Sequence, residues 1–275
     1  MIRKIMFFSL IVCGLLASCT RNAITNRSQL SLVSEGNMQS MALTQYKDFL
    51  STNKVITAGT GAAGKDAEMV KRVGNKIAVA INEYYTSKGQ ANALADYKWE
   101  FNLVDNKEVN AWCMPGGKVV VYTGLLPVTQ NETALAIVLG HEITHAVAGH
   151  GRERVSQQMV AQGVQIVAGD ALSNNAQAIG VFNMVYPTGA QVGVLLPNSR
   201  KQELEADHYG LIFAAMAGYN PEEAIPFWKR MAALSAAGGK QSAFLSDHPS
   251  DDQRIQKLQD LMPEALKYYN PAKNK

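Results

Sequence analysis

Two histidines, four residues apart in an apolar segment, are the feature of this 275-residue chain that most constrains its fold. The residues before them predict a helix buried at the centre of the protein, which continues into His141-Glu142-Ile143-Thr144-His145. On a helix, positions i and i+4 lie on one face, about 5.4 Å apart. Two imidazoles in this arrangement can bind one Zn²⁺ ion, and Glu142 can hydrogen-bond a water molecule on the metal.

A catalytic zinc ion needs a third protein ligand and an open fourth position. The pattern H-E-x-x-H-x-x-G-x-x-H would supply a third histidine, but the chain has Ala148 and Gly151 at the two required positions. His150 follows His141 by nine residues, about 180° around a continuous helix. We therefore expect His150 to cap the helix or to hydrogen-bond near its end, and not to bind the metal.

The remaining source of a third ligand is a carboxylate from another helix. Ser199 and Gln202 form a capping-box pattern that predicts a helix start. Glu203 and Asp207 are four residues apart and share one face of this helix, whereas Glu205 points away from that face. One of the two acids can bind zinc while the other hydrogen-bonds a zinc-binding histidine, and the spacing favours neither.

His141–His145 together with Ser199-Arg200 and Glu203-x-x-Ala206-Asp207 resembles the gluzincin metallopeptidases typified by the CAAX prenyl protease and HtpX. More closely, the chain resembles their compact, lipid-anchored periplasmic members, over about residues 67–262. The resemblance implies an α+β fold: a mainly helical, zincin-like minigluzincin with a small β-sheet whose edge strand borders the active-site cleft. It also implies one Zn²⁺ ion per chain, with Glu203 as the third ligand and Asp207 hydrogen-bonded beside it.

Residues 110–126 resemble the edge strand of that family and the turn that leads to its zinc helix. By this resemblance Asn110, Ala111 and Trp112 would pair with an extended peptide through backbone hydrogen bonds. Such bonds tolerate many side-chain sequences. Unfolded or extended polypeptides are therefore the expected partners.

Residues 246–258 resemble the His-Pro segment that precedes the last helix of the family. The resemblance implies that His248 approaches the zinc ion, where it would either stabilise the oxyanion or occupy the open position in a resting state. Arg254 is a second candidate for this role. The alternative is that His248 only precedes a helix that begins near Pro249.

Peptide hydrolysis by a zinc-dependent endopeptidase is the expected activity. Glu142 would take a proton from the attacking water and pass it to the leaving amine, and misfolded or unassembled envelope proteins would be the substrates. The alternative is a zinc-binding chaperone or assembly lipoprotein with little or no proteolysis. A glutamate beside the metal argues against this alternative, because a structural zinc ion needs no base.

The N-terminal sequence predicts a lipoprotein signal peptide over residues 1–18. Arg3 and Lys4 precede a short apolar run, and Leu16-Ala17-Ser18-Cys19 resembles the lipobox of bacterial lipoproteins. Cys19 would then carry lipid and anchor the chain in a bacterial envelope membrane; an ordinary signal peptide is the alternative. Thr20, where an aspartate would retain the protein in the inner membrane, favours the periplasmic side of the outer membrane by the same resemblance.

Residues 19–36 are polar and are expected to form a tether to one metallopeptidase domain, 37–275, with an insertion near the site at 155–198. Local patterns predict helices at 37–49, 67–86 and 251–262, strands at 99–104 and 118–122, and a capping box at Thr129–Glu132.

The net charge argues against nucleic-acid binding, and the cysteine content argues against a disulfide or a cysteine nucleophile. Removal of residues 1–18 leaves 24 basic residues against 23 acidic ones, a net charge of +1 that gives no electrostatic basis for nucleic-acid binding. Cys113 would be the one cysteine left after Cys13 is cleaved off and Cys19 is lipidated, so no intrachain disulfide is expected. We expect Cys113 to pack in the core rather than act as a nucleophile. The oligomeric state stays open.

Overall fold

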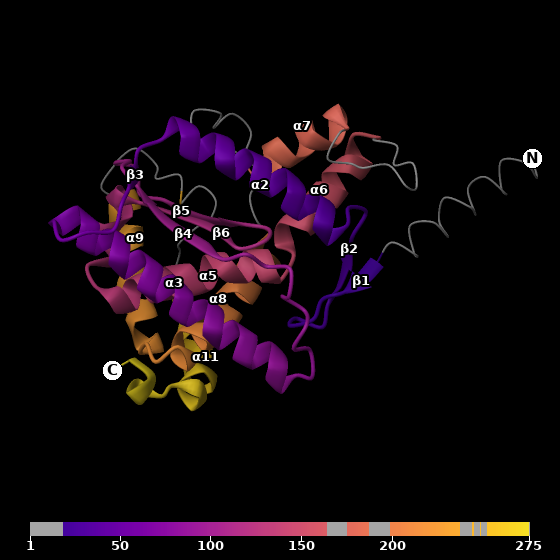
Figure 1. Ribbon diagram of the computed structural model, residues 1–275. Helices are drawn as coiled ribbons and strands as arrows, with labels where there is room; N and C mark the ends of the chain where they lie inside the picture. The colour runs from indigo at the N-terminus through magenta and orange to yellow at the C-terminus, as the bar shows by residue number, and fades with distance from the viewer. Residues whose placement is uncertain are drawn as a thin grey trace, which may run out of the picture.

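The computed structural model describes residues 19–163, 175–186, 199–236, Phe244, His248 and 252–274, so the expected signal peptide lies outside the described residues. Helices cover both faces of a four-stranded β-sheet, and a two-stranded hairpin lies at the edge of the molecule, which confirms the mainly helical α+β class expected from the sequence (Figure 1). The longer helices are α2 (Glu35–Thr52), α3 (Ala62–Ser87), α5 (Glu132–Val147), α6 (His150–Ala161), α7 (Ala176–Val185), α8 (Arg200–Met216), α9 (Ala224–Ala236) and α11 (Asp252–Ala265). The strands are β1 (Cys19–Arg21), β2 (Ser28–Leu30), β3 (Val55–Ile56), β4 (Glu100–Val104), β5 (Ala111–Met114) and β6 (Lys118–Tyr122).

The main sheet has the strand order β3-β4-β6-β5, and different helices cover its two faces. β6 runs parallel to β4 and antiparallel to β5. Val119 and Val121 of β6 pack in the cluster that contains α3 and α5, whereas Val120 and Tyr122 pack in the cluster that contains α2. Figure 1 shows these helices on opposite sides of the sheet. Both faces of β6 are buried, which explains its apolar run Val119–Val121.

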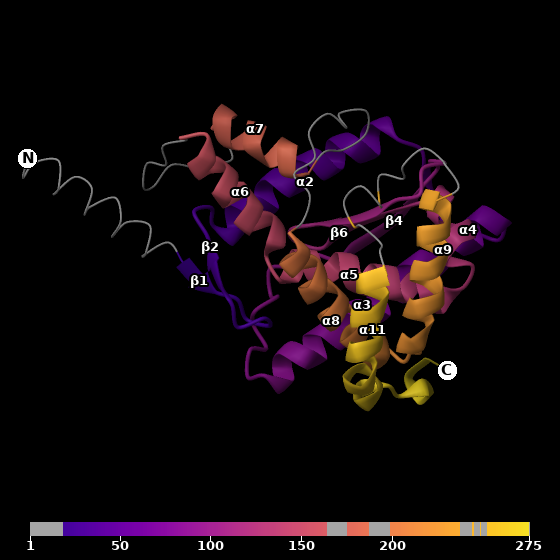
Figure 2. The ribbon, with the colours of Figure 1, turned by 180° about the vertical axis from the view of Figure 1, so that it is seen from behind.

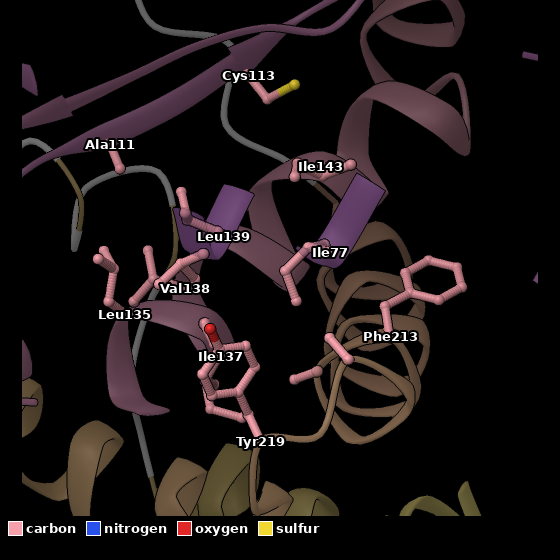
Figure 3. Close-up of a cluster of buried hydrophobic side chains, with 14 of the residues drawn as sticks. Ile77, Ala111, Cys113, Leu135, Ile137, Val138, Leu139, Ile143, Phe213 and Tyr219 are labelled. Carbon is pink, nitrogen blue, oxygen red and sulfur yellow. The ribbon is translucent and has the colours of Figure 1, made fainter. Parts of the chain in front are cut away.

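β5 is the last strand of this order and packs on α5. Ala111 and Cys113 belong to the same buried cluster as Leu139 and Ile143 of α5, and Figure 3 shows the four residues in one region of the core. Burial raises the pKa of the Cys113 thiol well above its usual value. A thiol without an accessible thiolate is a poor nucleophile, which supports the packing role expected for Cys113.

Helices α5 and α8 pack against each other at two facing glycines. A Cβ atom on Gly140 would lie 2.6 Å from the carbonyl oxygen of Gly210, and one on Gly210 would lie 2.8 Å from the backbone nitrogen of His141. The two backbones therefore touch directly beside the first histidine of the motif. α8 also begins with the predicted capping box, in which the Ser199 and Gln202 side chains each accept from the other's backbone N–H.

Residues 19–36 do not form the expected tether. β1 and β2 make an antiparallel hairpin that packs at the end of α5, seen at the edge of the molecule in Figure 2. Asn22 and Gln29 are buried, and both side-chain amides donate to the carbonyl oxygen of Ala148, at 2.8 and 2.9 Å. Carbonyl groups at a helix end lack helical partners. The polar residues of this segment thus satisfy the end of α5.

The start of α5 also differs from the expectation. Asn131 is its cap, and the Asn131 side chain accepts from the backbone N–H of Ala134 at 2.8 Å. The predicted capping box at Thr129–Glu132 is wrong, because Thr129 is the last residue of the short helix α4 (Leu126–Thr129). The Glu132 carboxylate instead forms an ion pair with Arg72 of α3.

The described part of the expected insertion 155–198 comprises most of α6 and the whole of α7. Both helices join α2 in a hydrophobic cluster on the outer face of the sheet, with Val155, Met159 and Phe182 fully buried. Among the described residues, no helix combines the length and apolar character that a membrane span requires.

Replacing Gly140 by alanine should destabilise the protein by about 1–3 kcal/mol, because the added methyl group meets backbone atoms that cannot rotate away. Urea unfolding of the metal-free protein would measure the change. The matched control is Gly180→Ala in α7, where a Cβ meets no atom within 4 Å. Alanine there should raise stability by up to about 1 kcal/mol. Equal unfolding midpoints for wild type and Gly140→Ala would contradict the close approach of the two helices.

Candidate metal centre

Two helices supply the core of a buried polar cluster. His141 and His145 come from α5, and their Nε2 atoms lie 3.1 Å apart. Glu203 comes from α8, and its two carboxylate oxygens lie 3.4 Å from Nε2 of His141 and 3.3 Å from Nε2 of His145. The structure thus brings together the two motif histidines and the downstream glutamate. Of the two acids that spacing alone left open, Glu203 is the one that faces both histidines.

His248 adds a fourth donor to this cluster. Its Nδ1 lies 3.0 Å from each oxygen of Glu203 and 3.1 Å from Nε2 of His141. Its Nε2 lies 3.3 Å from Oε1 of Glu142. One ligand atom from each of His141, His145, Glu203 and His248 lies within 4.8 Å of the other three, and all four residues are buried.

The residues present fit a zinc ion. Tetrahedral Zn²⁺ with bonds of about 2.0–2.1 Å to nitrogen or oxygen separates its ligand atoms by roughly 3.3–3.4 Å. The separations of 3.0–3.4 Å among these donors are close to that value. The imidazole nitrogens of His141 and His145 point at one another, an arrangement that a shared cation stabilises. Imidazoles and one carboxylate are also the ligand types that zinc prefers.

Asp207 and Arg254 set the orientation of His141. Nδ1 of His141 donates to Oδ1 of Asp207 at 3.0 Å, which leaves the lone pair of Nε2 for a metal ion. Arg254 in turn donates to both oxygens of Asp207, at 2.7 and 2.9 Å, and its guanidinium lies 3.4 Å from the ring centre of Trp228. Arg254 therefore holds Asp207 in place, and its Nη1 also lies 3.4 Å from Oε2 of Glu203.

Burial and neighbouring charges favour the neutral form of His145 and the ionised forms of Glu203 and Asp207. Burial lowers the pKa of His145 well below its usual value and keeps the imidazole neutral. Burial raises the pKa of Glu203, but the neighbouring imidazoles of His248, His141 and His145 outweigh it and hold that pKa well below its usual value. Arg254 does the same for Asp207. A neutral imidazole and an ionised carboxylate are both ready to bind a cation.

His145 has a support of its own that the sequence did not reveal. Its Nδ1 lies 2.9 Å from Nδ1 of His150, and Nε2 of His150 lies 3.0 Å from Oε2 of Glu205. The expectation that His150 hydrogen-bonds near the helix end and does not bind metal agrees with these contacts. The assumed continuous helix is wrong, because Gly149 adopts a left-handed φ of 66° between α5 and α6. A glycine after a helical run is a termination signal that could have predicted this break.

The other expected site residues are not members of the group of four donors. Asn110 and Trp112 are half-buried and Ala111 is buried, all at the start of β5, where the carbonyl oxygen of Asn110 accepts from Tyr122 N–H at 3.0 Å. Cys19 begins β1 and pairs with Leu30 of β2.

Comparison with known proteins places these residues in a family. Residues 65–262 match Peptidase family M48. The mitochondrial metalloendopeptidase OMA1 of Schizosaccharomyces pombe is 33% identical over 244 residues, which cover 88% of this chain and 66% of the relative. The beta-barrel assembly-enhancing protease of Yersinia pestis is 29% identical, covering 68% of this chain and 37% of the relative. The metalloprotease LoiP of Escherichia coli is 30% identical, covering 57% and 60%.

The chain spans less than two thirds of the length of these curated relatives. The M48 match nevertheless includes most of α3, the sheet strands β4 to β6, and all four clustered donors. With the histidine motif on α5 and the glutamate on α8 facing one metal position, the chain belongs to Peptidase family M48.

Proposed function

We propose that this protein is a zinc-dependent endopeptidase. The observation that carries the proposal is the position of Glu142, which is 4% exposed and lies beside the four clustered donors rather than among them. A purely structural zinc site has no use for an additional carboxylate at its side. A hydrolytic site needs one that can accept and return a proton.

The residues of this chain divide the chemistry between them. Zn²⁺ held by His141, His145 and Glu203 would polarise the scissile carbonyl and acidify the attacking water. Glu142 takes the proton of that water and returns it to the leaving amine. Asp207 keeps the ring of His141 in a single orientation, and Arg254 keeps Asp207 ionised.

The outer backbone edge of β5 is an argument for a polypeptide as the substrate. The bond from Tyr122 N–H to the Asn110 carbonyl makes these two residues a hydrogen-bonded pair, and such pairs alternate along antiparallel strands. The backbone groups of Ala111 and Cys113 therefore turn away from β6 towards the edge. An extended peptide added there would run over α5 and its histidine motif, paired through its backbone. Of the three expected substrate-binding residues, this register favours Ala111.

The same register favours substrates that are locally unfolded, because only an extended backbone can pair with β5. We propose misfolded or unassembled envelope proteins as the substrates. The N-terminal sequence up to Cys19 favours a lipid anchor and the periplasmic side of the outer membrane. The relatives include a bacterial beta-barrel assembly-enhancing protease and mitochondrial metalloendopeptidases, and the lipobox-like residues of this chain favour a bacterial setting.

His248 raises a second possibility. Structural zinc sites are closed by four protein ligands, whereas catalytic sites keep one position open. With Nδ1 of His248 3.0 Å from Glu203, the fourth donor is already present. This observation supports either a resting enzyme closed by His248 or a zinc-binding assembly protein that cuts nothing. For the enzyme, we propose that His248 withdraws to admit substrate, and its Nε2 is then available as a donor to the oxyanion.

Replacing Glu142 by glutamine should leave zinc bound and lower peptide cleavage by about 10²–10⁴-fold, since glutamine is isosteric but cannot take a proton. Casein hydrolysis and zinc content by atomic absorption, measured on the same preparation, check both parts. Removal of zinc by a chelator should abolish the wild-type activity, and added Zn²⁺ should restore it. Turnover by Glu142→Gln at the wild-type rate, with zinc bound, would contradict the assigned base.

Replacing His248 by alanine should raise casein cleavage, by about tenfold if closure is favoured by ~1.4 kcal/mol, while zinc stays bound by the other three residues. A fall in activity would instead assign His248 to the oxyanion. If neither wild type nor His248→Ala cuts casein with zinc bound, the non-proteolytic assembly function is correct.

A further inference from the structure

A second group of charged residues lies outside the four metal donors and connects the N-terminal hairpin to α6 and α8. Arg27, in the turn between β1 and β2, donates through Nε to Oε1 of Glu205 at 2.8 Å and through Nη2 to Oε2 of Glu153 at 2.8 Å. The side chains of Arg27 and Glu205 are both 14% exposed, and that of Glu153 is 8% exposed. Buried charges of this kind are costly unless they are paired, and these three charged side chains are paired with one another.

The group continues from Glu205 to a zinc-site histidine. Oε2 of Glu205 lies 3.0 Å from Nε2 of His150, which is fully buried, and Nδ1 of His150 lies 2.9 Å from Nδ1 of His145. One uninterrupted series of hydrogen bonds therefore connects four residues: Arg27, Glu205, His150 and His145. We call this series the hairpin-to-metal chain.

The donor and acceptor roles along this chain follow from its first member. An ionised carboxylate can only accept, so Nε2 of His150 carries the hydrogen and donates to Glu205. Nδ1 of a neutral His150 then has only a lone pair, and Nδ1 of His145 must donate to it. Arg27 lies 2.8 Å from Glu205 and keeps this carboxylate ionised, and full burial favours the neutral form of the His150 imidazole.

The donation from Nδ1 also determines that Nε2 of His145 carries no hydrogen. With its hydrogen on Nδ1, His145 presents the lone pair of Nε2 towards Glu203 and Nε2 of His141, at 3.3 and 3.1 Å. The opposite tautomer would place a hydrogen where the metal binds.

We propose that Arg27, Glu205 and His150 are positioning residues that hold His145 in its metal-binding tautomer and orientation, so that the N-terminal hairpin is a working part of the metal centre. Asp207 and Arg254 perform this task for His141, and the hairpin-to-metal chain performs it for His145. The proposal concerns metal affinity and is independent of whether the protein cuts peptides.

A purely structural role is the competing explanation, and the hairpin allows the two to be separated. Asn22 and Gln29 hold the hairpin to Ala148, and the hydroxyl of Tyr209 donates to the carbonyl of Ile24 at 2.7 Å. These contacts do not involve Arg27. Gln202 also donates to Glu153 at 2.8 Å, so removal of Arg27 does not leave Glu153 without a partner.

The test compares four variants of the full chain: His150→Leu, His150→Gln, Arg27→Met and, as matched control, Arg230→Met. Arg230 is also a partly buried arginine, paired with Glu223 at 3.0 Å and bonded to the carbonyl of Val128, away from the metal donors. Zn²⁺ affinity is measured by competition with a chromophoric chelator, and the visible absorption of bound Co²⁺ reports the ligand geometry. Circular dichroism and thermal unfolding of each metal-free variant establish that it is folded.

Loss of both hydrogen bonds in His150→Leu should weaken Zn²⁺ binding by about 10–100-fold and change the Co²⁺ spectrum. Glutamine can still accept from His145 and donate to Glu205, so His150→Gln should remain within about threefold of wild type. Arg27→Met should weaken binding by about threefold or more, and Arg230→Met should not.

Wild-type affinity and Co²⁺ spectrum in a folded His150→Leu would overturn the proposal. If His150→Leu does not fold, the two arginine variants decide. Equal Zn²⁺ affinities for Arg27→Met and Arg230→Met then overturn the role of the hairpin, and a selective loss in Arg27→Met supports it.

Discussion

The contact between α5 and α8 at Gly140 and Gly210 is the constraint on which the rest of the site depends. A zinc ion requires ligand atoms within a few ångströms of one another, and here they come from two helices far apart in sequence. Because neither glycine has a side chain, the two helices approach closely enough for Glu203 to face both His141 and His145. The sheet contributes from the other side, because β5 packs on α5 and fixes it beneath the strand edge.

Each of the two α5 histidines is oriented by a carboxylate from α8, and each carboxylate is paired with an arginine from another part of the chain. Asp207 bonds His141 directly and is held by Arg254 of α11. Glu205 acts on His145 through His150 and is held by Arg27 of the hairpin. Glu203, Glu205 and Asp207 lie at every second position of α8. A segment of little more than one helical turn therefore supplies the metal donor and both supporting acids. Burial removes water from both the carboxylate and the arginine, which costs free energy. The attraction between the two opposite charges offsets this cost and keeps the acid ionised.

The local elements and the two histidine donors of α5 could be predicted from sequence because they depend on short-range spacing. The i, i+4 relation of His141 and His145 follows from helix geometry, and the capping box at Ser199 follows from local hydrogen bonding. The choice of Glu203 over Asp207 needed the family resemblance, since both lie on one face of α8. The docked hairpin could not be predicted: Asn22 and Gln29 look like solvated residues until the carbonyl of Ala148 is placed beside them. His150 was misplaced on the helix because Gly149 breaks it.

The separation of the metal ligands along the sequence has a consequence for biosynthesis. Chains emerge from the N-terminus, and their early parts can fold while later parts are still being made. A chain that has emerged as far as residue 163 already contains the hairpin, the main sheet and α5 with His141, Glu142 and His145. It contains neither Glu203 nor the Asp207–Arg254 pair, so a nascent chain holds two ligands and a base without a complete site. The complete set of four donors can therefore form only at a late stage of synthesis, after Glu203 and His248 have been added to the chain.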